Sequence, residues 1–345
     1  MFDALENFTP PSSWRRLTTL DYHTAGEPLR IVTGGYPDLP GDDMLARRRY
    51  AADRLDHLRT ALMWEPRGHR EMYGCLLTPP VRADSHFGAL FMHNEGYSTM
   101  CGHAVIALGK AAVETGLVPA AEPVTTVRID TPAGTVTAFA RVSGGRVTSV
   151  SFHNVPSFVV DLDAEVDVPG LGRIRYDLAF GGAFYAYVPV AAVGLRLVPE
   201  DHQRLIEAGM AVKRAVTASR RIAHPFDEDL GFLYGVIFTG PPEGAGAHGR
   251  NVCIFAGGQV DRSPTGTGVS GRAALAHARG ERTAGDEWVV ESILGTRFTV
   301  RIARITRFGP YPAVIPEVEG RAHLTGRHTF FLDPDDELGA GFFMG

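Results

Sequence analysis

The sequence contains one cysteine whose setting favours proton chemistry. Cys101 follows Thr99, a residue type that favours the N-cap of a helix, and precedes a helical pattern over 102–116. It is therefore predicted at the second helical position, where backbone amides lack partners and carry partial positive charge. That field lowers the pKa of a cysteine from its free value of about 8.5. Cys101 is predicted to be a thiolate that acts as a general base.

A second segment repeats this arrangement without the thiol. Ser263-Pro264 suits the N-cap and the first helical position, which places Thr265 second, as Cys101 is in the first segment. Each helical pattern ends at a glycine suited to a C-terminal cap, Gly116 or Gly280, 15 residues after its key residue. The key residues are about half the chain apart. We predict two similar halves whose helix starts bind one carboxylate together.

The residues next to the key positions support a ligand site at these helix starts. Gly102 and Gly266 have no side chain, so a ligand can approach the backbone closely. A protease-like dyad of Cys101 with His103 is not expected, because residues two apart on a helix do not face each other. The predicted site is therefore a carboxylate cradle with a single thiol.

Composition limits the classes of function. The chain has 345 residues, enough for two domains, and its net charge of −5, without a basic block longer than 47–49, argues against nucleic acid. No apolar run is long enough to span a membrane, and no secretion signal is seen. Three cysteines, Cys75, Cys101 and Cys253, predict a reducing compartment, by default the cytoplasm, and the first and last are interpreted as buried hydrophobes. Residues 1–13 are expected to form a flexible arm.

The local patterns indicate many short strands and few helices. A helix is predicted over 41–63, and the glycine- and proline-rich stretch 240–249 is expected to be an exposed hairpin loop without function. The strand-like pattern pauses at 156–170 and then restarts. This pause is the predicted boundary between a first domain, 14–160, and a second, 161–321.

The chain resembles the proline racemase family along nearly its whole length. The resemblance rests on four motifs in fixed order: DYHTAGEP at 21–28, PRGH at 66–69, GYSTMCGH at 96–103 and DRSPTGTG at 261–268. It implies a diaminopimelate-epimerase-like α/β (α+β) fold, in which two pseudo-symmetric domains, each a curved sheet around a central helix, enclose the active site. In that fold the last residues can return to the first domain, so 322–345 is a candidate addition to the first domain.

The resemblance also narrows the reaction. Racemases and epimerases of this family use two cysteines, one on each face of the substrate Cα, whereas here the second position is Thr265. A threonine hydroxyl is too weak an acid to exchange protons as a thiol does. The Cys/Thr pairing resembles the trans-3-hydroxy-L-proline dehydratases. In that substrate the 3-hydroxyl and the Cα hydrogen share a ring face, so Cys101 alone could serve a syn elimination that yields Δ1-pyrroline-2-carboxylate.

The matching positions imply roles for the remaining site residues. The amides of Gly102, His103, Gly266 and Thr267 would hold the substrate carboxylate and stabilise the charge that develops on it. Asp261 would pair with the ring ammonium, and His103 would share that contact. Two other interpretations stay open, with Asp261 as a helix cap and His103 as a packed core histidine. No metal, flavin, pyridoxal phosphate or nucleotide is implied.

Other functions remain to be weighed against this one. A 4-hydroxyproline epimerase or proline racemase with an unusual second acid is the nearest alternative. A non-catalytic amino-acid-binding protein is a more remote one, since a thiol at the helix start would then have no use. The expected partner is a small hydroxyproline substrate. The sequence leaves the oligomeric state open, and a homodimer is one arrangement that it permits.

Overall fold

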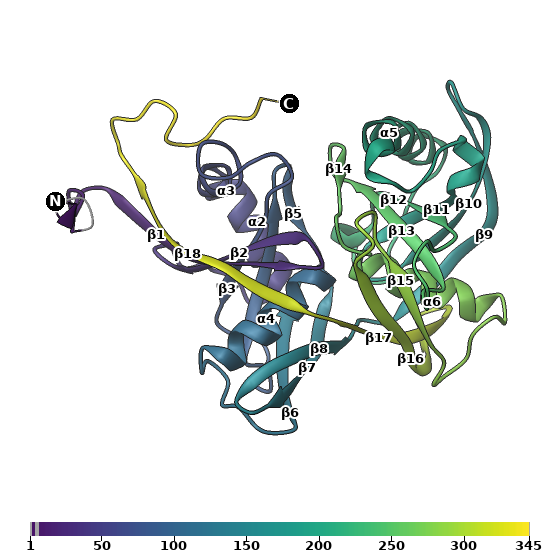
Figure 1. Cartoon of the computed structure of the whole chain (residues 1–345). Helices are drawn as coiled ribbons and strands as arrows, with labels where there is room; N and C mark the ends of the chain where they lie inside the picture. Colours follow the sequence, from purple (N-terminus) through teal and green to yellow (C-terminus); the bar gives the residue numbers. More distant parts are fainter. Residues whose placement is uncertain (1, 4–6, 345) are drawn as a thin grey trace.

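The computed structural model describes residues 2–3 and 7–344. Of the arm expected at 1–13, residues 1 and 4–6 lie outside these ranges. The chain forms two halves that lie side by side, and in each half paired strands close into a ring around one helix (Figure 1). This is the expected pseudo-symmetric α+β architecture.

The first ring is built from the N-terminal half and two C-terminal strands. Its strands are β1 (Arg15–Thr24), β2 (Glu27–Gly34), β3 (Tyr73–Thr78), β4 (Phe87–His93), β6 (Val124–Thr131), β7 (Gly134–Ser143) and β8 (Arg146–His153). They pair in this order, and β8 then pairs with β17 (Tyr311–Gly320). The chain continues from β17 into β18 (Ala322–Leu332), which pairs with β1 and closes the ring.

The second ring repeats this pattern. Its further strands are β9 (Ser157–Val168), β10 (Gly172–Phe180), β11 (Phe184–Pro189), β12 (Leu233–Gly240), β13 (Gly249–Phe255), β15 (Glu287–Glu291) and β16 (Arg297–Phe308). They pair in this order, β16 pairs with β17, and β17 pairs with β9. The parallel pairs occupy matching places, β2–β3 with β4–β6 in one ring and β11–β12 with β13–β15 in the other. The short strands β5 (Gly96–Ser98) and β14 (Gln259–Val260) extend β4 and β13.

The passage between the halves differs from the pattern expected from the sequence. The prediction that the strand-like pattern pauses at 156–170 is wrong, because β9 occupies most of this stretch. Acidic side chains at every second position from 161 to 167 lie on the outer side of β9, while Val166 and Val168 are buried. An amphipathic strand therefore resembled a polar linker. The loop expected at 240–249 is confirmed as the connection between the antiparallel strands β12 and β13.

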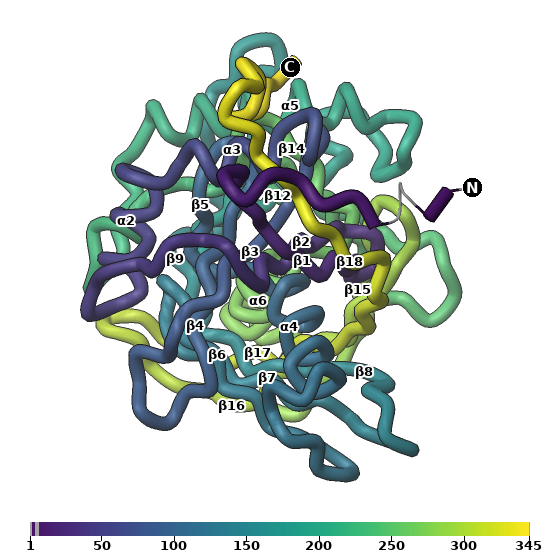
Figure 2. Tube along the Cα trace, turned by 90° about the vertical axis from the view of Figure 1, so that its left-hand side faces the viewer, coloured from purple at the N-terminus to yellow at the C-terminus, as the bar shows by residue number. Residues whose placement is uncertain are grey.

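Two helices occupy the centres of the rings, α4 (Gly102–Glu114) and α6 (Gly266–Ala278). Most residues of both helices are small, and 11 of the 13 in α4 and 9 of the 13 in α6 are buried, as expected of a helix enclosed by strands. Figure 2, viewed from the first half, shows α4 near the middle of the molecule with strands around it. The other helices lie outside the rings: α2 (Met44–Arg54), α3 (Asp56–Met63), α5 (His202–Ser219) and the 3₁₀ turns Val190–Val193, Pro199–Asp201 and Glu228–Leu230.

The helix predicted over 41–63 is present in two pieces. It breaks at Leu55, whose backbone leaves the helical conformation (φ −125°, ψ 11°). Arg59 in the second piece bonds Asp56 and donates to the carbonyls of His93 and Asn94. These tertiary bonds fix the direction of α3, which local periodicity could not reveal.

Candidate active site

Cys101 and Thr265 occupy the N-cap positions of α4 and α6, one residue before each helix. Their carbonyls accept the first helical hydrogen bonds, from the amides of Val105 at 3.0 Å and Val269 at 2.8 Å. The prediction that both lie at the second helical position is wrong. Their side chains are therefore not fixed by helical geometry.

The residues expected to cap these helices have other partners. The Thr99 hydroxyl donates to the carbonyl of Gly182 in the second half at 2.8 Å. The Ser263 hydroxyl accepts from the amide of Thr265 at 3.1 Å, and Pro264 lies before the helix. Thr99 and Ser263 therefore do not cap these helices, and each helix begins two residues later than the local prediction.

The two helix starts meet between the rings. A Cβ added to Gly102 would lie 2.5 Å from the Cα of Gly266, and a Cβ on Gly266 would lie equally close to the Cα of Gly102. Only glycine allows backbones to approach this closely. From the sequence, these glycines were expected to let a ligand come close to the backbone. In the structure they allow the two helix N-termini to come together.

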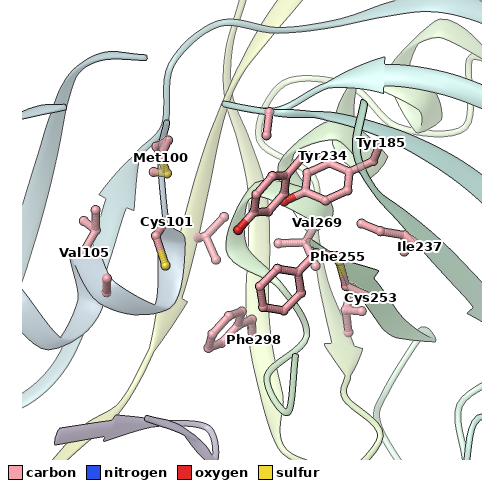
Figure 3. Packing of buried hydrophobic residues seen from close by; sticks show 14 of the residues in the cluster. Met100, Cys101, Val105, Tyr185, Tyr234, Ile237, Cys253, Phe255, Val269 and Phe298 are labelled. Carbon is pink, nitrogen blue, oxygen red and sulfur yellow. The ribbon is translucent and has the colours of Figure 1, made fainter. Parts of the chain in front are cut away.

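A narrow cavity lies at this meeting point. Residues of both halves line this space, so a ligand bound there contacts both. All seven residues proposed from the sequence line it. The other seven lining residues are Glu27, Tyr73, Met100, Tyr185, Tyr234, Cys253 and Phe255. Figure 3 shows Cys101 beside α4, with the aromatic residues of the second half across from it.

The thiol of Cys101 contacts the imidazole of His103. The Sγ lies 3.1 Å from Nδ1, and Nε2 lies 3.2 Å from the carbonyl of Pro28. Burial lowers the pKa of His103 to about 3, so the ring is neutral. A carbonyl only accepts, so Nε2 carries the proton and the lone pair of Nδ1 faces the thiol. The exclusion of this pair was wrong, because Cys101 precedes the helix.

The electrostatic setting of Cys101 also differs from the prediction. Burial raises its pKa well above the ordinary value of a thiol, and the negative charges of Asp261 and Glu27 raise it further. Hydrogen bonds from the Ala104 amide and the Tyr73 hydroxyl oppose this change. The direction of this shift is opposite to the lowered pKa that the sequence predicted for Cys101.

Two buried carboxyl groups line the same cavity. Asp261 accepts from the amide of Ser263 at 2.7 Å, so it supports the turn before α6 and also faces the site, and burial raises its pKa to about 6. Glu27 accepts from the amide of Arg262 at 2.8 Å through Oε2, while Oε1 has no partner among the described residues. Burial, with the charge of Asp261, raises the pKa of Glu27. These groups favour a cationic ligand.

Three tyrosines in the cavity wall were missed by sequence reasoning. The hydroxyl of Tyr73 lies 2.5 Å from Oγ of Ser98, and that of Tyr185 lies 2.7 Å from Oγ1 of Thr267. Tyr234 completes the set. Each tyrosine belongs to a buried strand or to its continuation, and the sequence gives no motif that separates such a residue from ordinary core.

Thr265 has an unusual backbone conformation and a hydroxyl that is unpaired within the described part of the chain. Its backbone is left-handed (φ 67°, ψ 99°), an outlier for a β-branched residue. Its buried hydroxyl has no hydrogen-bond partner among the described residues. Cys253, interpreted as a buried hydrophobe, is fully buried but also lines the cavity, and burial raises its pKa.

Polar contacts fasten the two halves beside the cavity. Arg262 of the second half pairs with Glu27 at 3.3 Å and with Glu71 at 3.1 Å in the first. The Gln259 amide donates to Asn94 at 3.0 Å. These bonds fix the spacing of the two helix starts. Within the described residues, no cluster of His, Cys, Asp and Glu is arranged to hold a metal ion, and no helix is long and apolar enough to cross a membrane.

Comparison with known proteins places this geometry in a family. The sequence model of the family described as proline racemase matches residues 19–343. A trans-3-hydroxy-L-proline dehydratase of Colwellia psychrerythraea is 49% identical over 332 residues, which cover 96% of this chain and 94% of that protein. A human protein of the same name is 47% identical over 337 residues, with coverage of 95% and 94%.

Solved structures show the same fold. A hydroxyproline epimerase from Agrobacterium vitis, crystallised with trans-4-hydroxy-L-proline, is 35% identical with a TM-score of 0.90 and 96% coverage of both chains. A probable proline racemase from Agrobacterium radiobacter, with bound carbonate, is 34% identical with a TM-score of 0.91 and coverage of 95% and 96%. A phenazine biosynthesis protein of Bacillus anthracis, at 12% identity and a TM-score of 0.59, shares the fold alone, over 91% of this chain and 99% of its own.

Proposed function

The chain belongs to the proline racemase family, and from this premise we infer that it is a hydro-lyase that dehydrates trans-3-hydroxy-L-proline. Full-length relatives of that activity in bacteria and in humans support the inference. We further propose a one-base mechanism. Its product is an enamine that tautomerises to Δ1-pyrroline-2-carboxylate.

The main support for the proposed mechanism is that one helix start has a thiol and the other a hydroxyl. Cys101 and Thr265 hold equivalent N-cap positions, so they approach a ligand between them from opposite sides. Only Cys101 has a group that accepts and returns a proton near neutral pH. A reaction that needs one base on one face suits this site, whereas inversion of Cα needs one on each.

The carboxylate of the substrate is proposed to bind where α4 and α6 meet. The amides of Gly102, His103, Gly266 and Thr267 lie in the first turns of the two helices, where amides lack helical partners. Loss of the Cα proton moves negative charge onto the carboxylate oxygens. Two helix N-termini stabilise that charge more than they stabilise the ground state.

The ring ammonium is proposed to bind Asp261, with the unpartnered Oε1 of Glu27 as a second acceptor. A secondary ammonium has two N–H donors, so it can bond both carboxylates. Its positive charge offsets the two negative charges that raise the pKa of Cys101. Substrate binding would thereby lower the pKa of Cys101, so that the thiol releases its proton to solvent and the thiolate serves as the base.

The elimination then takes place on one face of the ring. In trans-3-hydroxy-L-proline the Cα hydrogen and the 3-hydroxyl lie on the face opposite the carboxylate. The Cys101 thiolate accepts the Cα proton, the electron pair forms the Cα–C3 double bond, and the hydroxyl leaves with a proton as water. Thr265 faces the other side of the ring and takes no part in proton transfer.

Epimerisation of 4-hydroxyproline is the second candidate, favoured by the close structural similarity to a hydroxyproline epimerase. Thr265 argues against it, because no second thiol stands at that N-cap. A binding protein without activity would have no use for the contact between Cys101 and His103. The three cysteines are free, and we propose a reducing compartment, the cytoplasm, for the activity.

The substrate test uses the isomers of hydroxyproline. Purified protein incubated with trans-3-hydroxy-L-proline should form Δ1-pyrroline-2-carboxylate, measured after reduction to proline. The cis-3 isomer should give none, because its hydroxyl lies on the face away from Cys101. Failure with the trans-3 isomer, together with inversion of trans-4-hydroxy-L-proline, would replace this function with the epimerase.

A further inference from the structure

The cavity wall on the Cys101 side carries a tyrosine, whose hydroxyl is bonded to a buried serine, and the reaction above gives neither residue a role. Tyr73 on β3 and Ser98 on β5 are both buried, and their oxygens lie 2.5 Å apart. The Tyr73 ring meets the His103 ring edge-on, with centroids 4.9 Å apart. Tyr73 lines the cavity beside Cys101, and both belong to the first half.

The proposed dehydration lacks an acid on this side. A hydroxide ion is a poor leaving group, so the 3-hydroxyl needs a proton as its bond to C3 breaks. In a syn elimination that hydroxyl leaves on the face of Cys101. The thiol is the obvious donor, but it gains its own proton in the same step. A separate donor beside the thiol would remove this conflict.

We propose that Tyr73 is a catalytic acid, which protonates the departing 3-hydroxyl while the Ser98 hydroxyl donates to the phenol oxygen. This inference rests on the proposed dehydratase function and adds the group that releases water. Ser98 acts by positioning, since its bond orients the phenol and stabilises the phenolate that forms.

The protons and electrons of this step balance. The Cα–H bond breaks and an S–H bond forms on Cys101, while the C–H electron pair becomes the new double bond. The C3–O bond breaks and its oxygen takes the proton of Tyr73, which releases water and leaves a phenolate. The Cys101 thiol then returns its proton to the phenolate, because a thiol is ordinarily a stronger acid than a phenol. Thiolate and phenol are thereby restored.

The other two tyrosines of the cavity suit this role less well. Tyr185 belongs to the second half, and its hydroxyl is bonded to Thr267. Tyr234 also comes from the second half, where its ring stacks on Phe255 at 5.5 Å (Figure 3). Burial, followed by the negative charge of Cys101, raises the pKa of Tyr73 and keeps the phenol protonated until the reaction needs it.

Tyr73→Phe separates leaving-group chemistry from proton abstraction. We expect kcat for dehydration of trans-3-hydroxy-L-proline to fall about 100-fold or more, the contribution of a general acid. Exchange of the Cα hydrogen of L-proline in heavy water needs only Cys101 and should fall less than about tenfold. A purely structural role would lower both rates equally. Tyr234→Phe is the comparison variant, with both rates expected to change in parallel.

A substrate with a better leaving group provides a second test of Tyr73. In trans-3-chloro-L-proline chloride leaves without a proton, so Tyr73→Phe should eliminate it at close to the wild-type rate. An equal loss with both substrates, or a selective loss in Tyr234→Phe instead, would overturn the assignment. If wild-type protein does not dehydrate trans-3-hydroxy-L-proline, the function fails. If wild type and Tyr73→Phe dehydrate it equally well, only the role of Tyr73 fails.

Discussion

The two helix starts are equal in architecture and unequal in chemistry. Cys101 and Thr265 each cap a 13-residue buried helix, and each is followed by a glycine that contacts the other helix. The backbone of Cys101 is extended (φ −144°), whereas that of Thr265 is left-handed (φ 67°). The repeated fold therefore supplies two equivalent positions, and in this chain a thiol occupies one of them.

The next polar position sharpens the contrast. His103 in α4 contacts the Cys101 thiol and the Pro28 carbonyl, whereas Thr267, its counterpart in α6, is bonded to Tyr185. The first half thus surrounds a reactive sulfur with polar partners. The second half contributes amides and a carboxylate, to which we assign the binding of the ligand. Each prediction below changes one side of this comparison.

The largest expected effect is loss of the base. Cys101→Ser should lower dehydration by about 10⁴-fold, at the upper end of what a positioned base contributes, because a serine hydroxyl is too weak an acid to be ionised. Thr265→Ala is the matched control in the other half and should lose less than about tenfold. Steady-state rates for both variants, with circular dichroism as a check of folding, make this test. Similar losses in both would mean that the halves share the chemistry.

The contact between the helices gives the next effect. Gly102→Ala and Gly266→Ala should each lower kcat/KM by about 100-fold, because the added Cβ must push the helix starts apart and misplace the amides. The two losses should be similar, since the same gap is affected from either side. A normal rate in either variant would contradict the shared carboxylate cradle.

The pH dependence tests the charges of the site. Asp261 has a pKa of about 6 and must be ionised to bind the ammonium, so kcat/KM should fall as pH drops below about 6. The raised pKa of Cys101 predicts a continued rise of kcat/KM on the alkaline side of neutrality. Arg262→Gln should move the acid limb upward, because Arg262 lowers the pKa of Asp261. A flat profile between pH 5 and 9 would contradict both assignments.

The smallest effects concern the second helix start. Thr265→Ser should change dehydration by less than about threefold, since the hydroxyl is not a proton carrier in this account. Thr265→Cys should gain slow inversion of trans-4-hydroxy-L-proline, because it supplies a thiol on the second face. Chiral chromatography of the product measures this gain. Fast inversion by the wild-type protein would contradict the view that only one helix start has a working acid–base group.

The sequence was informative where local signals carry the structure. The matched helices, their C-terminal glycines at 116 and 280 and the seven site residues follow from spacing and motif, and both glycines have the expected left-handed backbone. The first helix start was misplaced because Thr99 bonds a carbonyl of the other half, and the second because Ser263 bonds the amide of Thr265, before the helix. The contact with His103 was missed for the same reason. Tyr73 and Tyr234 could not be found, because only the closed rings bring them to the cavity.

The central claim is that one thiol serves one face of Cα, and isotope exchange on L-proline tests it most directly. L-Proline has no leaving group, so the wild-type protein in heavy water can only exchange or invert its Cα hydrogen. We predict that deuterium enters L-proline with retention of configuration, and that D-proline does not accumulate. Appearance of deuterated D-proline as fast as deuterated L-proline would show two working bases and contradict the account.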